Sequence, residues 1–182
     1  NSEKMSKSKG TFINARDYLN YLSPAFLRYY YACKLTPEFD DLYLNFTDFE
    51  NRVNSDLIGK ITNLASRLAP MINKKYNNKL CSLDSEGKAL TKLASEKAST
   101  ISSYYEERKF ARATILIRQI ADEANKYIDT KEPWKLLKTD PLKAHEVITA
   151  GLNVFRIIAI YLTPILPNYS LAVSKLFKEK NY

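Results

Sequence analysis

Residues 4–8 are the first group in the chain whose types and spacing could do chemistry. They read Lys4, Met5, Ser6, Lys7 and Ser8, so ammonium and hydroxyl groups alternate over a short stretch. On a loop, such groups can close over a polyphosphate, where lysine acts as a compact positive charge and offsets the negative charge that develops as a phosphate bond breaks. Short loops of lysine and serine are also common on solvated surfaces, so composition leaves both interpretations open.

The rest of the chain is expected to be helical. Apolar residues recur at spacings of three and four from Val53 to Ile72 and from Phe110 to Ile128, which is typical of helices with one buried face. Thr47 and Glu50 are spaced as a capping box, and Asp140-Pro141 has the form of a helix start. Helices are expected at residues 14–22, 25–32, from 47 to about 72, 85–107, 109–129, 133–138 and 141–162, with a last one ending near 178.

Short links between amphipathic helices indicate an all-α fold. The expected architecture is an antiparallel helical bundle preceded by a short, mostly helical connecting region, because neighbouring helices with short links pack around shared apolar stripes. Two parts are predicted. Residues 1–46 hold the opening loop and the connecting region, and residues 47–182 form the bundle.

Composition narrows the class of partner. The net charge is +8 and the pI is about 9.3, which indicates an anionic partner such as nucleic acid, although a merely basic protein would look the same. Cys33 and Cys81 lack CxxC spacing and His145 is the only histidine, so no metal site is expected and a reducing cytoplasm suits the thiols. No stretch is long and apolar enough to suggest a membrane span. The first residue is Asn1, which suggests a piece of a longer protein.

The string KMSKS at residues 4–8 matches the signature loop of class I aminoacyl-tRNA synthetases. The later runs LRYYYACKL, DDLYLNFTDFENRVNSDLIGKITNLASR and NKYIDTKEPW extend the likeness over nearly the whole chain, which resembles the methionyl-tRNA synthetase family. That family activates methionine with ATP and Mg to methionyl-adenylate, and then esterifies the methionyl group onto its tRNA.

The resemblance implies that the nucleotide-binding half precedes residue 1. In the intact enzyme Lys7 would stabilise the transition state of activation, and the ATP-binding residues would be Lys4, Met5, Ser6, Lys7 and Ser8. We find no catalytic constellation in the remaining residues. The chain alone is therefore expected to bind tRNA without catalysis and without a bound cofactor.

The resemblance also implies an anticodon-binding role for residues 47–182. Asn63 and Arg67 match family positions that read the first anticodon base of tRNA(Met), a cytosine, and Trp134 matches the indole on which this base stacks. Residues four apart project from one side of a helix, and an aromatic face with polar groups beside it is a usual means of reading unpaired RNA bases. Asn125 and Asp129 match positions that shape the pocket. Asp129 could accept a hydrogen bond from a base amino group or orient Arg67.

Plainer interpretations remain open at this stage. Asp56, Lys60, Asn63 and Arg67 could form a solvated helix face with an ion pair between residues four apart, and a single tryptophan in a chain of this size is more often part of a core. In place of a synthetase fragment, the chain could be a freestanding helical tRNA- or RNA-binding module, or a purely structural interaction bundle.

Overall fold

Helices make up the whole of the described secondary structure of this protein. The structure, a computed structural model, describes residues 6, 9–10, 12–38, 42 and 44–179, and no strand is found among them. The elements are α1 (Ala15–Leu19), α2 (Pro24–Ala32), α3 (Phe46–Asn51), the π-helix η1 (Arg52–Thr62), α4 (Asn63–Tyr76), α5 (Ser85–Ser95), α6 (Ala98–Glu106), α7 (Phe110–Lys131), α8 (Pro133–Thr139), α9 (Pro141–Tyr161) and α10 (Pro167–Leu176).

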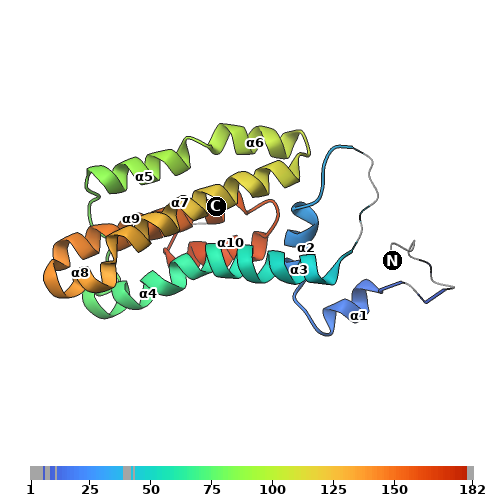
Figure 1. The fold of residues 1–182 in the computed structure, drawn as a ribbon, viewed down its shortest axis with the longest axis horizontal. Coiled ribbons are helices and arrows are strands. Elements are labelled where there is room, and N and C mark those ends of the chain that lie inside the picture. The colour runs from blue at the N-terminus through green and yellow to red at the C-terminus, as the bar shows by residue number, and fades with distance from the viewer. Residues whose placement is uncertain (1–5, 7–8, 11, 39–41, 43, 180–182) are drawn as a thin grey trace.

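The expected all-α bundle is confirmed, and α9 is its central helix. It packs against α4, α5, α7 and α8. Eleven of its residues are buried, which explains why its sequence is apolar on nearly every side. Figure 1 shows η1 and α4 continuing along one edge, while α7 follows the same direction beside them and α5 with α6 provides the return. Some neighbouring helices are therefore parallel. The helix α4 runs parallel to α7, and α5 runs parallel to α9, since Asp84 contacts Lys143 at one end of that pair and Ala94 contacts Tyr161 at the other.

Local signals set most helix starts. Ser23 caps α2 by accepting a hydrogen bond from the amide of Ala25, and Asp140 caps α9 by accepting one from the amide of Lys143. The prediction of a capping box at Thr47 and Glu50 is wrong. The helix α3 begins at Phe46, because Asn45 has an extended backbone and its carboxamide oxygen accepts from the amide of Asp48 at 2.9 Å.

The expected single helix at 85–107 is two helices, α5 and α6. The hydroxyl of Tyr161 on α9 donates to the carbonyls of Ala94 and Ser95, at 2.9 and 3.3 Å. This contact ties the break to the central helix. A regular α-helix was expected after residue 51, but the structure has the π-helix η1 there. The π-helix is a wider form that often occurs at functional sites.

Candidate nucleic-acid interface

The polar site that the sequence pointed to lies where α4, α7 and α8 meet. The helix α7 ends at Glu132, whose backbone is left-handed with φ 44°, and Pro133 starts α8 at once. Glu132 donates from its amide to the carbonyl of Ile128 at 2.9 Å, so α8 follows α7 without a linking loop. This connection places Trp134 in the first turn of α8, close in the chain to Asp129 on the last turn of α7.

Arg67 on α4 contacts both of these residues. Its Nη2 donates to Oδ1 of Asp129 at 2.6 Å, and its guanidinium carbon lies 5.1 Å from the centre of the Trp134 ring. The Trp134 side chain is 37% exposed, which rules out a purely core role for it. The site therefore combines an accessible flat ring, a fork of hydrogen-bond donors and a carboxylate acceptor.

Asn63 and Asn125 occupy different places relative to this cluster. Asn63 lies one turn before Arg67 on α4 and accepts from the hydroxyl of Ser66 at 3.2 Å through its carboxamide oxygen. Asn125 donates from its side-chain nitrogen to the carbonyls of Lys60 and Ala121, at 3.0 and 2.9 Å. Its amide group thus fastens α7 to η1, which agrees with a residue that shapes the site from behind.

The polar strip on η1 and α4 is not a solvated face with an internal ion pair. Each of its first two charged residues pairs with a residue on α7. Asp56 pairs with Arg118 at 2.7 Å, and Lys60 pairs with Asp122 at 2.8 Å. The intrahelical pair considered from the sequence is therefore replaced by contacts to α7.

Exposed lysines border the site, and the sequence reasoning missed them. Lys74 and Lys75 lie in the last turn of α4, and Lys135 and Lys138 lie on α8 with Trp134. Lys135 pairs with Glu132 at 2.8 Å. The signal was present in the run PWKLLK, where two lysines follow the tryptophan. Such lysines can bind phosphate groups and would add affinity without base selectivity.

Most of the opening loop lies outside the described residues. Of the five residues of KMSKS, only Ser6 is described, so the assignments of Lys4, Met5, Lys7 and Ser8 stay predictions. No group of three or more His, Cys, Asp or Glu residues that could hold a metal ion occurs in the described part of the chain. Similarly, no described helix has the length and apolar character needed to cross a membrane.

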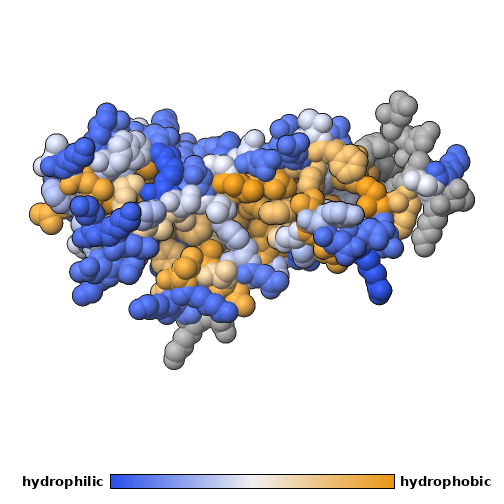
Figure 2. All heavy atoms as spheres, turned by 90° about the horizontal axis from the view of Figure 1, so that it is seen from below, coloured by the Kyte–Doolittle hydropathy of each residue, from blue (hydrophilic) through white to orange (hydrophobic). Residues whose placement is uncertain are grey.

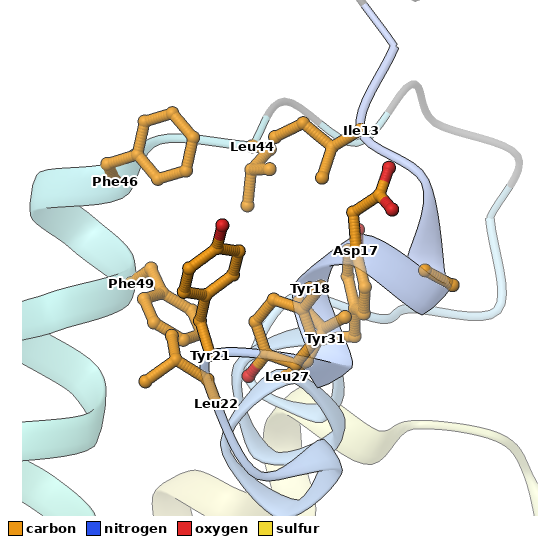
Figure 3. Close-up of a pocket in the computed structure, with 11 residues that line it drawn as sticks. Ile13, Asp17, Tyr18, Tyr21, Leu22, Leu27, Tyr31, Leu44, Phe46 and Phe49 are labelled. Carbon is orange, nitrogen blue, oxygen red and sulfur yellow. The ribbon is translucent and has the colours of Figure 1, made fainter.

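A hollow at another place in the structure is apolar. Side chains of α1, α2 and α3 surround a space of about 470 Å³, and aromatic rings such as those of Tyr21 and Phe49 form much of its wall (Figure 3). Asp17 is the one charged side chain among the described residues that line it. Figure 2 shows apolar side chains gathered over this end of the molecule, which includes the exposed residues Tyr21 and Phe46. Without convergent polar groups, this hollow is not a candidate active site.

Two family models match the chain. Residues 1–69 match the family described as tRNA synthetases class I (M), and residues 78–182 match the anticodon binding domain of methionyl tRNA ligase. Among curated proteins, the methionine–tRNA ligase of Bdellovibrio bacteriovorus is 56% identical over 182 residues, which are all of this chain and 26% of that protein. The methionine–tRNA ligase of Vesicomyosocius okutanii is 45% identical over 177 residues, which are 96% of this chain and 32% of that protein.

Solved structures share the fold. The methionyl-tRNA synthetase of Mycobacterium tuberculosis aligns with a TM-score of 0.84 in its free state, at 20% identity, over 93% of this chain and 35% of that one. Its complex with methionyl-adenylate aligns with a TM-score of 0.88 at 23% identity, over 97% of this chain and 36% of that one. The chain thus spans about a third or less of the length of the relatives it matches.

Proposed function

Because the chain belongs to the family of methionyl-tRNA ligase anticodon-binding domains, we propose that it recognises the CAU anticodon of tRNA(Met). The observation that supports this most directly is the Arg67 guanidinium, which pairs with Asp129 and lies over the exposed ring of Trp134. A flat ring beside donors and an acceptor suits a single unpaired base, which RNA-binding proteins hold by stacking and by hydrogen bonds to its edge.

Cytosine fits this set of groups. Its Watson–Crick edge offers two acceptors, which the donors of Arg67 and Asn63 can meet, and one amino group, which the carboxylate of Asp129 can accept. Uracil carries an oxygen in place of that amino group and would face the carboxylate with an acceptor. The proposal therefore assigns base stacking to Trp134, edge contacts to Asn63 and Arg67, and a supporting role to Asp129 and Asn125.

The longer protein is proposed to be a methionine–tRNA ligase. It would form methionyl-adenylate and pyrophosphate from methionine and ATP, and then transfer the methionyl group to tRNA(Met). In that enzyme Lys4, Met5, Ser6, Lys7 and Ser8 would bind ATP with Mg, and Lys7 would offset charge on the reacting phosphates. Residues 1–46 would brace the inner stem of the tRNA, and the protein would work in the cytoplasm. This chain alone would bind tRNA without catalysis.

A titration with two anticodon stem-loops tests the proposal. Trp134 is the only tryptophan, so its fluorescence reports binding at this site without a label. We expect saturable quenching by a CAU loop and much weaker binding of a UAU loop at the same ionic strength. The affinity should fall as salt rises, with a slope of about −0.7 for each phosphate neutralised in a single strand.

A variant completes this test. Trp134→Leu removes the flat ring, and stacking of one base on an aromatic side chain contributes about 1–3 kcal/mol, so the Kd of a labelled CAU loop should rise roughly 5- to 150-fold. Equal binding of the CAU and UAU loops by the unchanged protein would contradict the proposal and leave a basic, unselective RNA-binding bundle.

A further inference from the structure

The interface between η1/α4 and α7 carries a regular series of ion pairs. Asp56 pairs with Arg118 at 2.7 Å, Lys60 with Asp122 at 2.8 Å, and Arg67 with Asp129 at 2.6 Å. In every pair the two residues are 62 positions apart in the sequence. A constant difference means that the two helices run parallel and in a fixed register. We call these three contacts the interhelical ion pairs.

The order of charges along η1 and α7 favours the observed alignment of the two helices over alignments shifted by one turn. Along η1 an acid, Asp56, precedes a base, Lys60, whereas along α7 a base, Arg118, precedes an acid, Asp122. If one helix slid by a single turn, Lys60 would face Arg118, or in the other direction Asp56 would face Asp122. Both slides bring like charges together, which is unfavourable. The interhelical ion pairs thus specify how far along α7 the helix α4 lies.

Two separate contacts join Lys60 to α7. Its ammonium group pairs with Asp122, and its backbone carbonyl accepts from the side chain of Asn125 at 3.0 Å. These contacts lie in the last turn of η1, just before the chain returns to an α-helix at Asn63. The wider π-helix changes the rotation per residue, so the point at which it ends decides where Asn63 and Arg67 project.

We propose that Lys60, Asp122 and Asn125 are positioning residues that hold the Arg67 guanidinium against Trp134 by setting the register of α4 on α7. This inference rests on the proposed function, since the site so positioned is the base-reading site. The Lys60–Asp122 pair is partly exposed, with side chains 40% and 50% accessible. Exposed pairs of this kind contribute little to stability, so variants of the pair should fold.

A charge exchange separates positioning from simple stabilisation. Lys60→Asp places two carboxylates together, and the exchanged protein Lys60→Asp/Asp122→Lys restores an ion pair with the opposite orientation. We expect Lys60→Asp to reduce the preference for a CAU loop over a UAU loop at least fivefold. It should also change the emission maximum and iodide quenching of Trp134 in the absence of RNA. The exchanged protein should recover most of both signals.

The control variant is Lys92→Asp on α5. Lys92 pairs with Glu96 at 3.6 Å on the exposed side of α5, so this variant makes the same change in charge beside a carboxylate away from the interface. It should lower the affinity for both loops equally and leave the Trp134 signals unchanged. If Lys60→Asp shifts the unfolding midpoint but leaves base preference and Trp134 emission unchanged, the pair only stabilises the fold and the inference fails.

Three further outcomes are informative. If the exchanged protein recovers neither signal, the ion pair does not set the register and the inference is wrong. If the unchanged protein does not distinguish the two loops, the proposed function fails, but Trp134 emission without RNA still tests the register. Should Lys60→Asp not fold, Asp122→Asn removes the pair without repulsion, and an unchanged Trp134 emission in that variant would overturn the inference.

Discussion

Arg67 illustrates how one side chain can serve structure and recognition together. Its guanidinium is planar, so one face can lie over the Trp134 ring while an edge nitrogen donates to Asp129. The partner carboxylate is 59% exposed, and a pair of this kind adds little to stability. Its main effect is therefore to limit the orientations that the guanidinium adopts beside the ring.

Arg67→Lys tests the value of this planar group. The ammonium keeps the charge and can still reach Asp129, but it has neither a flat face nor a fork of donors. We expect the affinity for a CAU loop to fall about tenfold, which corresponds to roughly 1.4 kcal/mol, while the slope of affinity against salt stays the same. Titrations at several salt concentrations measure both quantities.

Lys74→Ala is the matched comparison for Arg67→Lys. Lys74 is exposed in the last turn of α4 and is a candidate for phosphate contact. Its removal should weaken binding of CAU and UAU loops alike and make the salt slope shallower. A loss of base preference in Lys74→Ala, or an unchanged affinity of Arg67→Lys for the CAU loop, would contradict the roles assigned to these residues.

At the scale of helices, α5 is attached to the central helix through its N-cap residue, Asp84. Asp84 caps α5 by accepting from the amide of Gly87 at 2.8 Å, and its second oxygen contacts the ammonium group of Lys143 on α9. The hydrogen bond from Lys143 lowers the pKa of the Asp84 carboxyl below its ordinary value. A single carboxylate thus starts one helix and joins it to another.

This lowered pKa predicts a pH-dependent contribution to stability. Because the folded pKa lies below the unfolded value of about 3.9, the contribution is complete above that value and is lost as the pH falls through the folded pKa. Asp84→Asn keeps a capping oxygen but lacks the charge, so its deficit relative to the unchanged protein should be constant above about pH 4 and should shrink as the pH falls below that value. Urea unfolding across this range measures the deficit.

Asp84→Ala separates the cap from the charge. It removes the capping acceptor as well and should cost about 1 kcal/mol more than Asp84→Asn at neutral pH. A difference between Asp84→Asn and the unchanged protein that is the same at every pH would show that the Lys143 contact does not contribute to folding.

For the whole molecule, close packing of three helices lies directly behind the candidate site. Gly151 on α9 faces Leu68 on α4 and Ile128 on α7, the residues next to Arg67 and Asp129 in the chain. A Cβ atom at Gly151 would lie 2.5 Å from a methyl carbon of Leu68 and 3.0 Å from one of Ile128. Glycine at this position therefore permits α9 to approach both helices that carry the site.

A double-mutant cycle measures this packing. Leu68 is fully buried, so Leu68→Ala should cost about 2–5 kcal/mol of unfolding free energy. Gly151→Ala should be tolerated better in the Leu68→Ala protein than alone, because the new methyl group enters the vacated space and alanine favours the helix. Urea unfolding of the four proteins gives the coupling. Strictly additive effects would contradict the close approach.

The sequence by itself determined the helices, because their signals are local. Apolar spacing and the helix start at Asp140-Pro141 act over a few residues each, and most helices lie where these signals predict them, although residues 85–107 form two helices rather than one. The candidate residues Asn63, Arg67 and Trp134 came from the family resemblance, and their roles in reading a base remain predictions.

Only the tertiary structure decided which polar groups meet. The sequence offered Asp56 and Lys60 as partners of each other, whereas each pairs with a residue 62 positions away on α7. The break between α5 and α6 likewise contacts a residue far along the chain, Tyr161, whose hydroxyl donates to the carbonyl of Ala94. Such contacts depend on which helices become neighbours, and the packing of all the apolar faces around α9 decides that, rather than any local pattern.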